Sequence, residues 1–153
     1  MKQKTRLSTL LTALVVAACH ADAPRLASSN QIVDDAIPQP VSNVDASAEI
    51  GQQVFSDRDQ GHCVLCHVIP AVDAPFQGNV GPELTNIGDR LSPGQIRLRI
   101  VDVQSISPET VMPSYYRIHD LYQVDDDYAG RPILSADQVE HLVAFLSAQK
   151  DAQ

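Results

Sequence analysis

The pattern of apolar and polar residues predicts two helices that lie far apart along the chain. The first covers residues 46–55, where Ile50, Val54 and Phe55 share one face at helical spacing. Gly51 lies beside this face and has no side chain to keep a neighbouring element at a distance. We therefore expect another backbone to approach this helix closely at Gly51.

The second predicted helix begins at Ser135. Ser135 and Gln138 have the spacing of a capping box, in which each side chain satisfies a backbone N–H at the start of a helix. An apolar stripe follows, made up of Val139, Leu142, Val143 and Leu146, with Phe145 at its edge. This spacing predicts an amphipathic helix with one buried face.

The first 18 residues have the pattern of a secretory signal peptide. A basic start precedes the apolar stretch 7–18, which is too short to span a membrane. Residues 16–19 resemble a bacterial lipobox, in which Cys19 becomes a lipidated first residue. Cleavage near residues 21–23 is the alternative and would leave a soluble product. We therefore expect a periplasmic protein, either tethered as a lipoprotein or free.

Residues 24–44 contain three prolines and little periodicity. Segments of this composition often serve as linkers, so we expect a flexible N-terminal arm here. The compact domain is then expected to cover residues 45–150, a length that suits a single domain.

Charge and composition narrow the classes of partner. The 153 residues include 11 basic and 19 acidic ones, giving a formal net charge of −8, and loss of the signal peptide makes the charge more negative. Nucleic acid and anionic membrane surfaces repel such a protein, so we expect neither as a partner. Aromatic residues make up only 5% of the chain. A small domain with so thin a core should fold poorly unless it encloses a large apolar group.

The most specific chemical signal is the sequence Cys63-Val64-Leu65-Cys66-His67. Its form, C-x-x-C-H, is the attachment signature of a c-type haem. The two thiols can form thioethers to the haem vinyl groups, and the histidine can then ligate the iron. One such motif predicts one haem c. A zinc site would need a second pair of ligands, and a thiol–disulfide protein, the alternative from another class, would need a strand before the motif.

The second axial ligand of the iron is expected to be a methionine or a histidine. Met112 is the only methionine that remains once the signal peptide is removed, and Pro113 stiffens the non-helical segment around it. His119, seven residues further on, is the alternative ligand. We expect His62 to point away from the haem and His141 to lie on the polar side of the last helix.

The order of these features resembles class I cytochromes c. In that family the first and last helices cross, and a Gly-Pro-x-Leu segment follows the haem motif; residues 81–84 match this segment. The resemblance implies an all-α, class I cytochrome c-like domain around one covalently bound haem. It also implies that the carbonyl of Pro82 accepts a hydrogen bond from the ring of His67, which orients the imidazole and raises its basicity.

Several short sequences in the second half of the chain are more distinctive. They occupy residues 81–90, 100–102, 112–117 and 130–135, and include Met-Pro-Ser-Tyr-Tyr-Arg and Gly-Arg-Pro-Ile-Leu. Together they resemble the SoxX family, the monohaem cytochrome subunits of the bacterial SoxAX complexes that oxidise thiosulfate. The similarity covers roughly residues 47–148, and it implies His67 and Met112 as the axial ligands.

The resemblance implies a role in electron transfer. In such complexes thiosulfate is joined oxidatively to a cysteine of the SoxYZ carrier protein, which releases two electrons. We expect this chain to accept electrons from a SoxA-type subunit and to pass them to a downstream cytochrome, as part of an L-cysteine S-thiosulfotransferase complex. We expect no catalytic residue in the chain itself. A free-standing monohaem carrier is the alternative among redox proteins.

Four polar side chains are further candidates. Arg90, Arg117, Tyr115 or Tyr116 could hydrogen-bond a haem propionate. The two tyrosines could instead pack at a subunit interface, where aromatic residues are enriched. The acidic run 125–127 is expected to form a solvated turn.

Overall fold

The structure is a computed structural model that describes residues 31–151, and its regular elements are helices, as the sequence predicts. In chain order they are α1 (Ala48–Ser56), the 3-10 helix η2 (Cys63–Leu65), α2 (Ile87–Arg90), α3 (Pro93–Asp102), the 3-10 helices η3 (Val103–Ser105) and η4 (Asp126–Tyr128), and α4 (Ala136–Ser147). In residues 31–151 no helix is both long and apolar enough to pass through a membrane.

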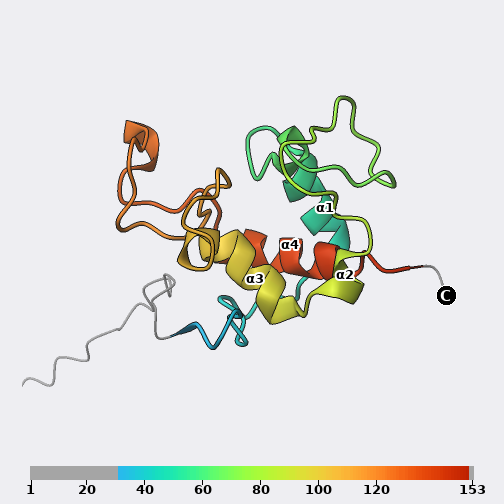
Figure 1. Cartoon of the computed structure of the whole chain (residues 1–153), viewed down its shortest axis with the longest axis horizontal. Helices are drawn as coiled ribbons and strands as arrows, with labels where there is room; N and C mark the ends of the chain where they lie inside the picture. The colour runs from blue at the N-terminus through green and yellow to red at the C-terminus, as the bar shows by residue number, and fades with distance from the viewer. Residues whose placement is uncertain (1–30, 152–153) are drawn as a thin grey trace, which may run out of the picture.

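The two helices expected from the sequence form and pack against each other. α1 begins after Ser47, whose side chain accepts a hydrogen bond from the backbone of Ile50. α4 begins after Ser135 with the predicted capping box to Gln138. Figure 1 shows α4 across the middle of the molecule, and both α1 and α3 pack against it. The core therefore forms where these three helices meet.

The packing of α1 on α4 depends on the glycine that the sequence singles out. A Cβ atom on Gly51 would lie 2.0 Å from the carbonyl oxygen of His141, so only glycine allows so close an approach. The rings of Phe55 and Phe145 pack beside this point, with centroids 5.5 Å apart and planes inclined by 56°. Such a tilted arrangement is favoured between aromatic rings.

The expectation that His141 lies on a polar side of the last helix is wrong. His141 is buried, and its Nδ1 atom accepts a hydrogen bond of 3.0 Å from the backbone N–H of Ser47. The physical reason is that α4 is covered by α1 on one side and by α3 on another, so little of its surface faces water.

The expectation of a flexible arm is also wrong for the part of residues 24–44 that the structure describes. Ile37 is 1% exposed and Val41 8% exposed, both within the core. The Arg97 guanidinium donates to the carbonyl of Ile37 at 2.8 Å and forms a 2.8 Å ion pair with Glu140. Glu140 in turn accepts from the backbone N–H of Val41 at 2.8 Å. The folded domain thus includes this segment, and does not begin near residue 45.

Other sequence-based expectations fall outside the part of the chain that the structure describes. These are the signal peptide at residues 1–18, the lipobox at Cys19, the alternative cleavage near 21–23, and residues 24–30 of the expected arm.

Candidate functional site

A cavity of about 860 Å³ opens beside the core, between the attachment motif, α3 and the loop that follows η3. Its size is within the range of about 300–1,000 Å³ that small-molecule and cofactor sites occupy. Most of the site residues that the sequence predicts line it: Cys63, Cys66, His67, Pro82, Arg90, Met112 and Tyr115. Much of the remaining wall is apolar and includes Phe55, Leu84, Ile87, Ile96, Ile100 and Leu142.

The attachment motif forms a tight turn at the wall of this cavity. Residues 63–65 adopt the 3-10 helix η2, and the backbone N–H groups of Cys66 and His67 both donate to the carbonyl of Cys63, at 3.1 and 2.9 Å. His62, which was expected to point away from the haem, is also among the residues that line the cavity. The chain turns through a left-handed conformation at His62 (φ 46°), which the sequence pattern did not indicate.

The ring of His67 is held in one tautomer. Its Nδ1 atom lies 2.7 Å from the carbonyl oxygen of Pro82. A carbonyl can only accept, so Nδ1 carries the hydrogen and Nε2 keeps a free lone pair. This is the state in which a histidine ligates a metal. Gly81 permits the arrangement, because a Cβ atom there would lie 2.4 Å from the His67 ring.

The thiol of Cys63 does not have the character of a redox-active cysteine. Burial raises its pKa to about 12, because the cavity wall disfavours the charged thiolate. Reactive cysteines in thiol–disulfide proteins have lowered pKa values instead. In residues 31–151, no three or more His, Cys, Asp or Glu side chains are grouped so as to hold a metal ion.

Met112 reaches the cavity on the loop of residues 106–117, which we call the methionine loop. Met112 is half-buried, and its backbone N–H donates to Oγ1 of Thr110 at 3.2 Å. His119, the alternative ligand, is exposed and does not line the cavity. Of the two candidates, only Met112 is therefore placed to bind a group inside it.

Sequence reasoning missed one arginine of the cavity wall. Arg99 lines the cavity beside Ile96 and Ile100 and forms an ion pair of 3.4 Å with Asp35. The sequence could have indicated this position of Arg99, because Arg99 follows Ile96 by three residues on α3 and residues three or four apart share a helix face. The other arginine of the wall, Arg90, donates to two backbone carbonyls at 3.0 and 3.1 Å.

The two adjacent tyrosines differ in position. Tyr115 lines the cavity, and burial raises its pKa above the usual value of 10.0. Tyr116 is fully buried in the core, so it is not available for a subunit interface, one of the roles considered for it. Arg117 does not line the cavity and instead forms a 3.2 Å ion pair with Asp102.

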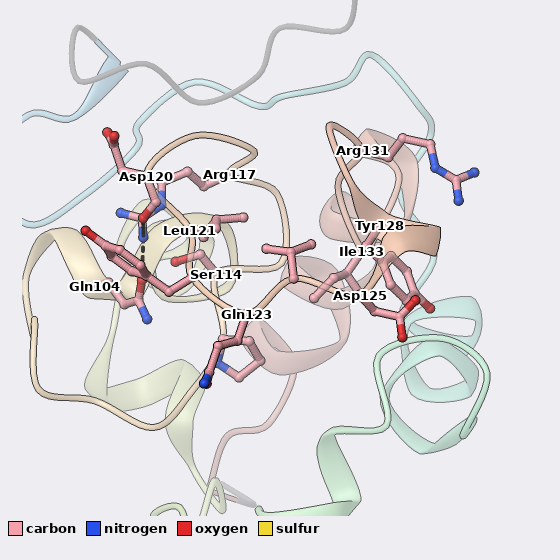
Figure 2. A pocket seen from close by; sticks show the side chains of 13 residues that line it. Gln104, Ser114, Arg117, Asp120, Leu121, Gln123, Asp125, Tyr128, Arg131 and Ile133 are labelled. Atoms are coloured by element: carbon pink, nitrogen blue, oxygen red, sulfur yellow. Dashed lines mark hydrogen bonds between the residues drawn. The ribbon is translucent and has the colours of Figure 1, made fainter.

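A second, smaller cavity of about 330 Å³ lies behind the methionine loop (Figure 2). It is lined by Ser114 and Arg117 from that loop and by Tyr128 and Ile133 from the segment around η4, while the side chain of Arg131 points away from it. The acidic run 125–127 is exposed and continues into the short helix η4. The mixed charges of this cavity favour no particular ligand.

The residues of the large cavity fit a covalently attached haem. Two thiols, a histidine with a free Nε2 atom and a methionine thioether are the donors that a c-type haem with His/Met ligation requires. The apolar wall suits the porphyrin, and the arginines could meet its carboxylates.

Comparison with solved structures agrees with this chemistry. The fold is similar to that in the crystal structure of SoxXA from P. pantotrophus, with a TM-score of 0.72 and 30% sequence identity over 78% of this chain and 93% of that chain. The c-type cytochrome SorU from Sinorhizobium meliloti also matches, with a TM-score of 0.44 and 18% identity over 67% of this chain and 90% of that chain. No protein-family model and no curated protein matches the chain.

Proposed function

Because the chain belongs to the SoxX family of c-type cytochromes, we propose that it is the electron-transfer subunit of a complex that oxidises thiosulfate. The observation that carries the proposal is the cavity that brings Cys63, Cys66, His67 and Met112 together. These residues come from two parts of the chain, and a role in the core alone would not explain why both thiols, the imidazole and the thioether line one cavity.

In this proposal each cavity residue has a defined role. Cys63 and Cys66 would hold one haem through thioethers, and Nε2 of His67 and the sulfur of Met112 would ligate its iron. Pro82 orients the imidazole through the hydrogen bond of 2.7 Å. The bound haem supplies a one-electron couple, with a potential that His/Met ligation raises.

The side chains that line the rest of the cavity have supporting roles. Arg90, Arg99 and Tyr115 are candidates to hydrogen-bond the haem carboxylates. The apolar wall keeps water away from the group and so contributes to its potential. In this proposal neither of the two cysteines among the described residues, Cys63 and Cys66, takes part in sulfur transfer, since both would attach the haem.

The electron balance explains why the chain would work with partners. Joining the terminal sulfur of thiosulfate to a cysteine thiol of a SoxYZ-type carrier forms one S–S bond and releases one proton and two electrons. A single haem accepts one electron at a time, so we propose that a SoxA-type subunit carries the reaction and that this chain relays electrons to a downstream cytochrome. The similarity to SoxXA from P. pantotrophus supports a SoxA-type partner.

We further propose that the protein acts in the periplasm after removal of residues 1–18, and that Cys19 carries a lipid anchor. Mass spectrometry of the mature native protein tests both points together with haem attachment. A first residue after position 19, without a lipid, would rule out the anchor and leave a freely diffusing subunit.

The decisive test is reduction of the haem by substrate. The chain is produced with a SoxA-type partner in a host that attaches haem, and thiosulfate and a SoxYZ-type carrier are then added. We expect the sulfur-to-iron charge-transfer band of the ferric His/Met haem to disappear as electrons arrive. If the chain stays alone in native extracts and thiosulfate with the carrier never reduces it, it is a free-standing carrier. A colourless mature protein would exclude both roles.

A further inference from the structure

We propose that Asp102 is the positioning residue of the methionine loop, which holds Met112 at the cavity through Ser114 and Arg117. The inference rests on the proposed function, because it takes Met112 to be an axial ligand. Asp102 itself does not line the cavity, so it would act on the haem only through the loop.

The contacts of Asp102 are short and shielded from water. Oδ1 of Asp102 accepts a hydrogen bond of 2.8 Å from the hydroxyl of Ser114, and Nη1 of Arg117 lies 3.2 Å from the same oxygen. Asp102 is 8% exposed and Ser114 4% exposed. Hydrogen bonds to a charged group are stronger than neutral ones, and a buried partner left unpaired is costly. The carboxylate is therefore a strong attachment point.

These contacts bear directly on Met112. Ser114 follows Met112 with only Pro113 between them, and the fixed φ of proline limits how far the two can move apart. Backbone bonds from Tyr115 to Ile100 (3.1 Å) and from Tyr116 to Val101 (3.2 Å) continue the attachment along the last turn of α3.

The other side of Met112 offers little support. Val111 is 82% exposed, and the backbone N–H of Met112 donates only to the local side chain of Thr110. The methionine is thus held from its C-terminal side, where Asp102 provides the side-chain contacts.

Asp102 also makes contacts where the chain leaves α3 and where the methionine loop ends. Its carbonyl accepts from the hydroxyl of Ser105 at 2.7 Å, at the point where α3 ends and η3 begins. Arg117, the last residue of the methionine loop, hydrogen-bonds Gln104 and forms the ion pair with Asp102, and both of these partners precede the loop. Residues 103 and 117 are thereby kept near each other, which limits the conformations open to the loop between them.

The test measures how readily the methionine leaves the iron in the ferric holoprotein. Added cyanide competes with Met112, and its binding rate depends on how often the loop opens. Asp102→Asn keeps the shape of the side chain but removes the charge, so we expect cyanide to bind about tenfold faster or more. The charge-transfer band should also be lost at a temperature below that at which circular dichroism reports unfolding of the helices.

Glu140→Gln is the matched control. It weakens the other buried ion pair, between Arg97 and Glu140, which ties the segment around Ile37 to α3 and α4. We expect it to lower the unfolding temperature while cyanide binding stays within about twofold of the unchanged protein, because neither Arg97 nor Glu140 lines the cavity and sites that share no partner act independently. Ser114→Ala, which keeps the ion pair, should raise the cyanide rate by a smaller factor, and it replaces Asp102→Asn if that variant does not fold.

The outcomes separate this inference from the proposed function. Cyanide binding at the unchanged rate in Asp102→Asn and Ser114→Ala, with the charge-transfer band present in the unchanged protein, overturns the positioning role and leaves the function standing. Equal acceleration by Glu140→Gln also overturns it, because the effect would then be one of general stability. Absence of the band from the unchanged protein overturns Met112 as the ligand, and this inference with it.

Discussion

The two segments that carry the candidate ligands are held in different ways. Around His67, most contacts join backbone groups: the N–H groups of Gly78, Gly81 and Leu84 donate to carbonyls of residues 64, 66 and 68 at 2.8, 2.8 and 3.0 Å. The uncharged side chain of Gln77 adds hydrogen bonds to the backbone of Ile69 and Val72 at 2.7 and 2.8 Å. The methionine loop relies in addition on a buried charge, because the Asp102 carboxylate bonds Ser114 and Arg117.

This difference predicts which ligand is the more easily lost. A substitution rarely removes a backbone hydrogen bond, so the attachment segment should keep its shape in most variants. The side-chain contacts of the methionine loop converge on one buried carboxylate, so a single substitution there should loosen the loop. We expect most substitutions to leave His67 in place, and substitutions at the contacts of the methionine loop to displace Met112.

The largest effect should come from removing the covalent attachment. In the double variant Cys63→Ala, Cys66→Ala, no thioether can form, and we expect essentially all covalently bound haem to be lost. The apolar cavity wall would then lack the group that it encloses, so circular dichroism should report a marked loss of helix. A denaturing gel stained for haem gives the first measurement. A fully helical, stable apoprotein would contradict the view that the group completes the core.

Met112→Ala should have the next largest effect, because it removes a ligand and leaves the attachment intact. We expect the charge-transfer band to vanish and the reduction potential to fall by on the order of 100 mV, since axial ligands set haem potentials over a range of about 0.8 V. Absorption spectra and a redox titration measure both. His119→Ala is the control and should change neither; an unchanged spectrum in Met112→Ala would transfer the role to His119.

Gly81→Ala tests whether the histidine side can be disturbed at all. The new Cβ atom would lie 2.4 Å from the His67 ring, so the ring or the backbone must shift. We expect a loss of about 1–3 kcal/mol in unfolding free energy, typical of overpacking, with the haem still attached. Gly94→Ala is a milder control, because its Cβ atom would come no closer than 3.1 Å to a neighbour. Denaturant titration of both variants compares them.

The smallest effect concerns Tyr115 and appears only at high pH. Burial raises the pKa of this phenol, so the folded protein holds the proton more tightly than the unfolded chain does. The stability from this group is complete below the unfolded pKa of about 10 and is lost as the pH rises above it. Above pH 10 the unchanged protein should lose unfolding free energy that Tyr115→Phe keeps. The difference in unfolding free energy between the two proteins should therefore shift in favour of Tyr115→Phe between pH 7 and pH values above 10. Equal pH dependence of unfolding in the two proteins would show that Tyr115 contributes nothing.

The sequence predicted the features that depend on residues close together along the chain. The capping box at Ser135 and the close approach at Gly51 depend on spacings of a few residues, and both are present. The SoxX family followed chiefly from the short sequences at residues 112–117 and 130–135, and the helical fold from the resemblance to class I cytochromes c; both are confirmed by the comparison with SoxXA.

What the sequence did not predict depends on partners far along the chain. Ile37 and Val41 lie in a segment with the composition of a linker, and their burial follows from Arg97 and Glu140, which are 60 and 99 residues away from them. Asp102 belongs to one of the short sequences that carry the family resemblance, residues 100–102, but nothing in that sequence indicates that its side chain bonds Ser114 and Arg117. No pattern of apolar spacing reports such contacts.

The joining of α1 to α4 has a consequence for how the protein is made. Ser47 and His141, which are bonded to each other, are 94 positions apart, and the residues that follow α1 include both thiols. A chain emerges from the ribosome, or from an export channel, starting at its N-terminus. The helix α1 therefore cannot pack against α4 until nearly the whole polypeptide has emerged. Both thiols are therefore delivered before α4, and an attaching enzyme could reach them before α1 and α4 pack together.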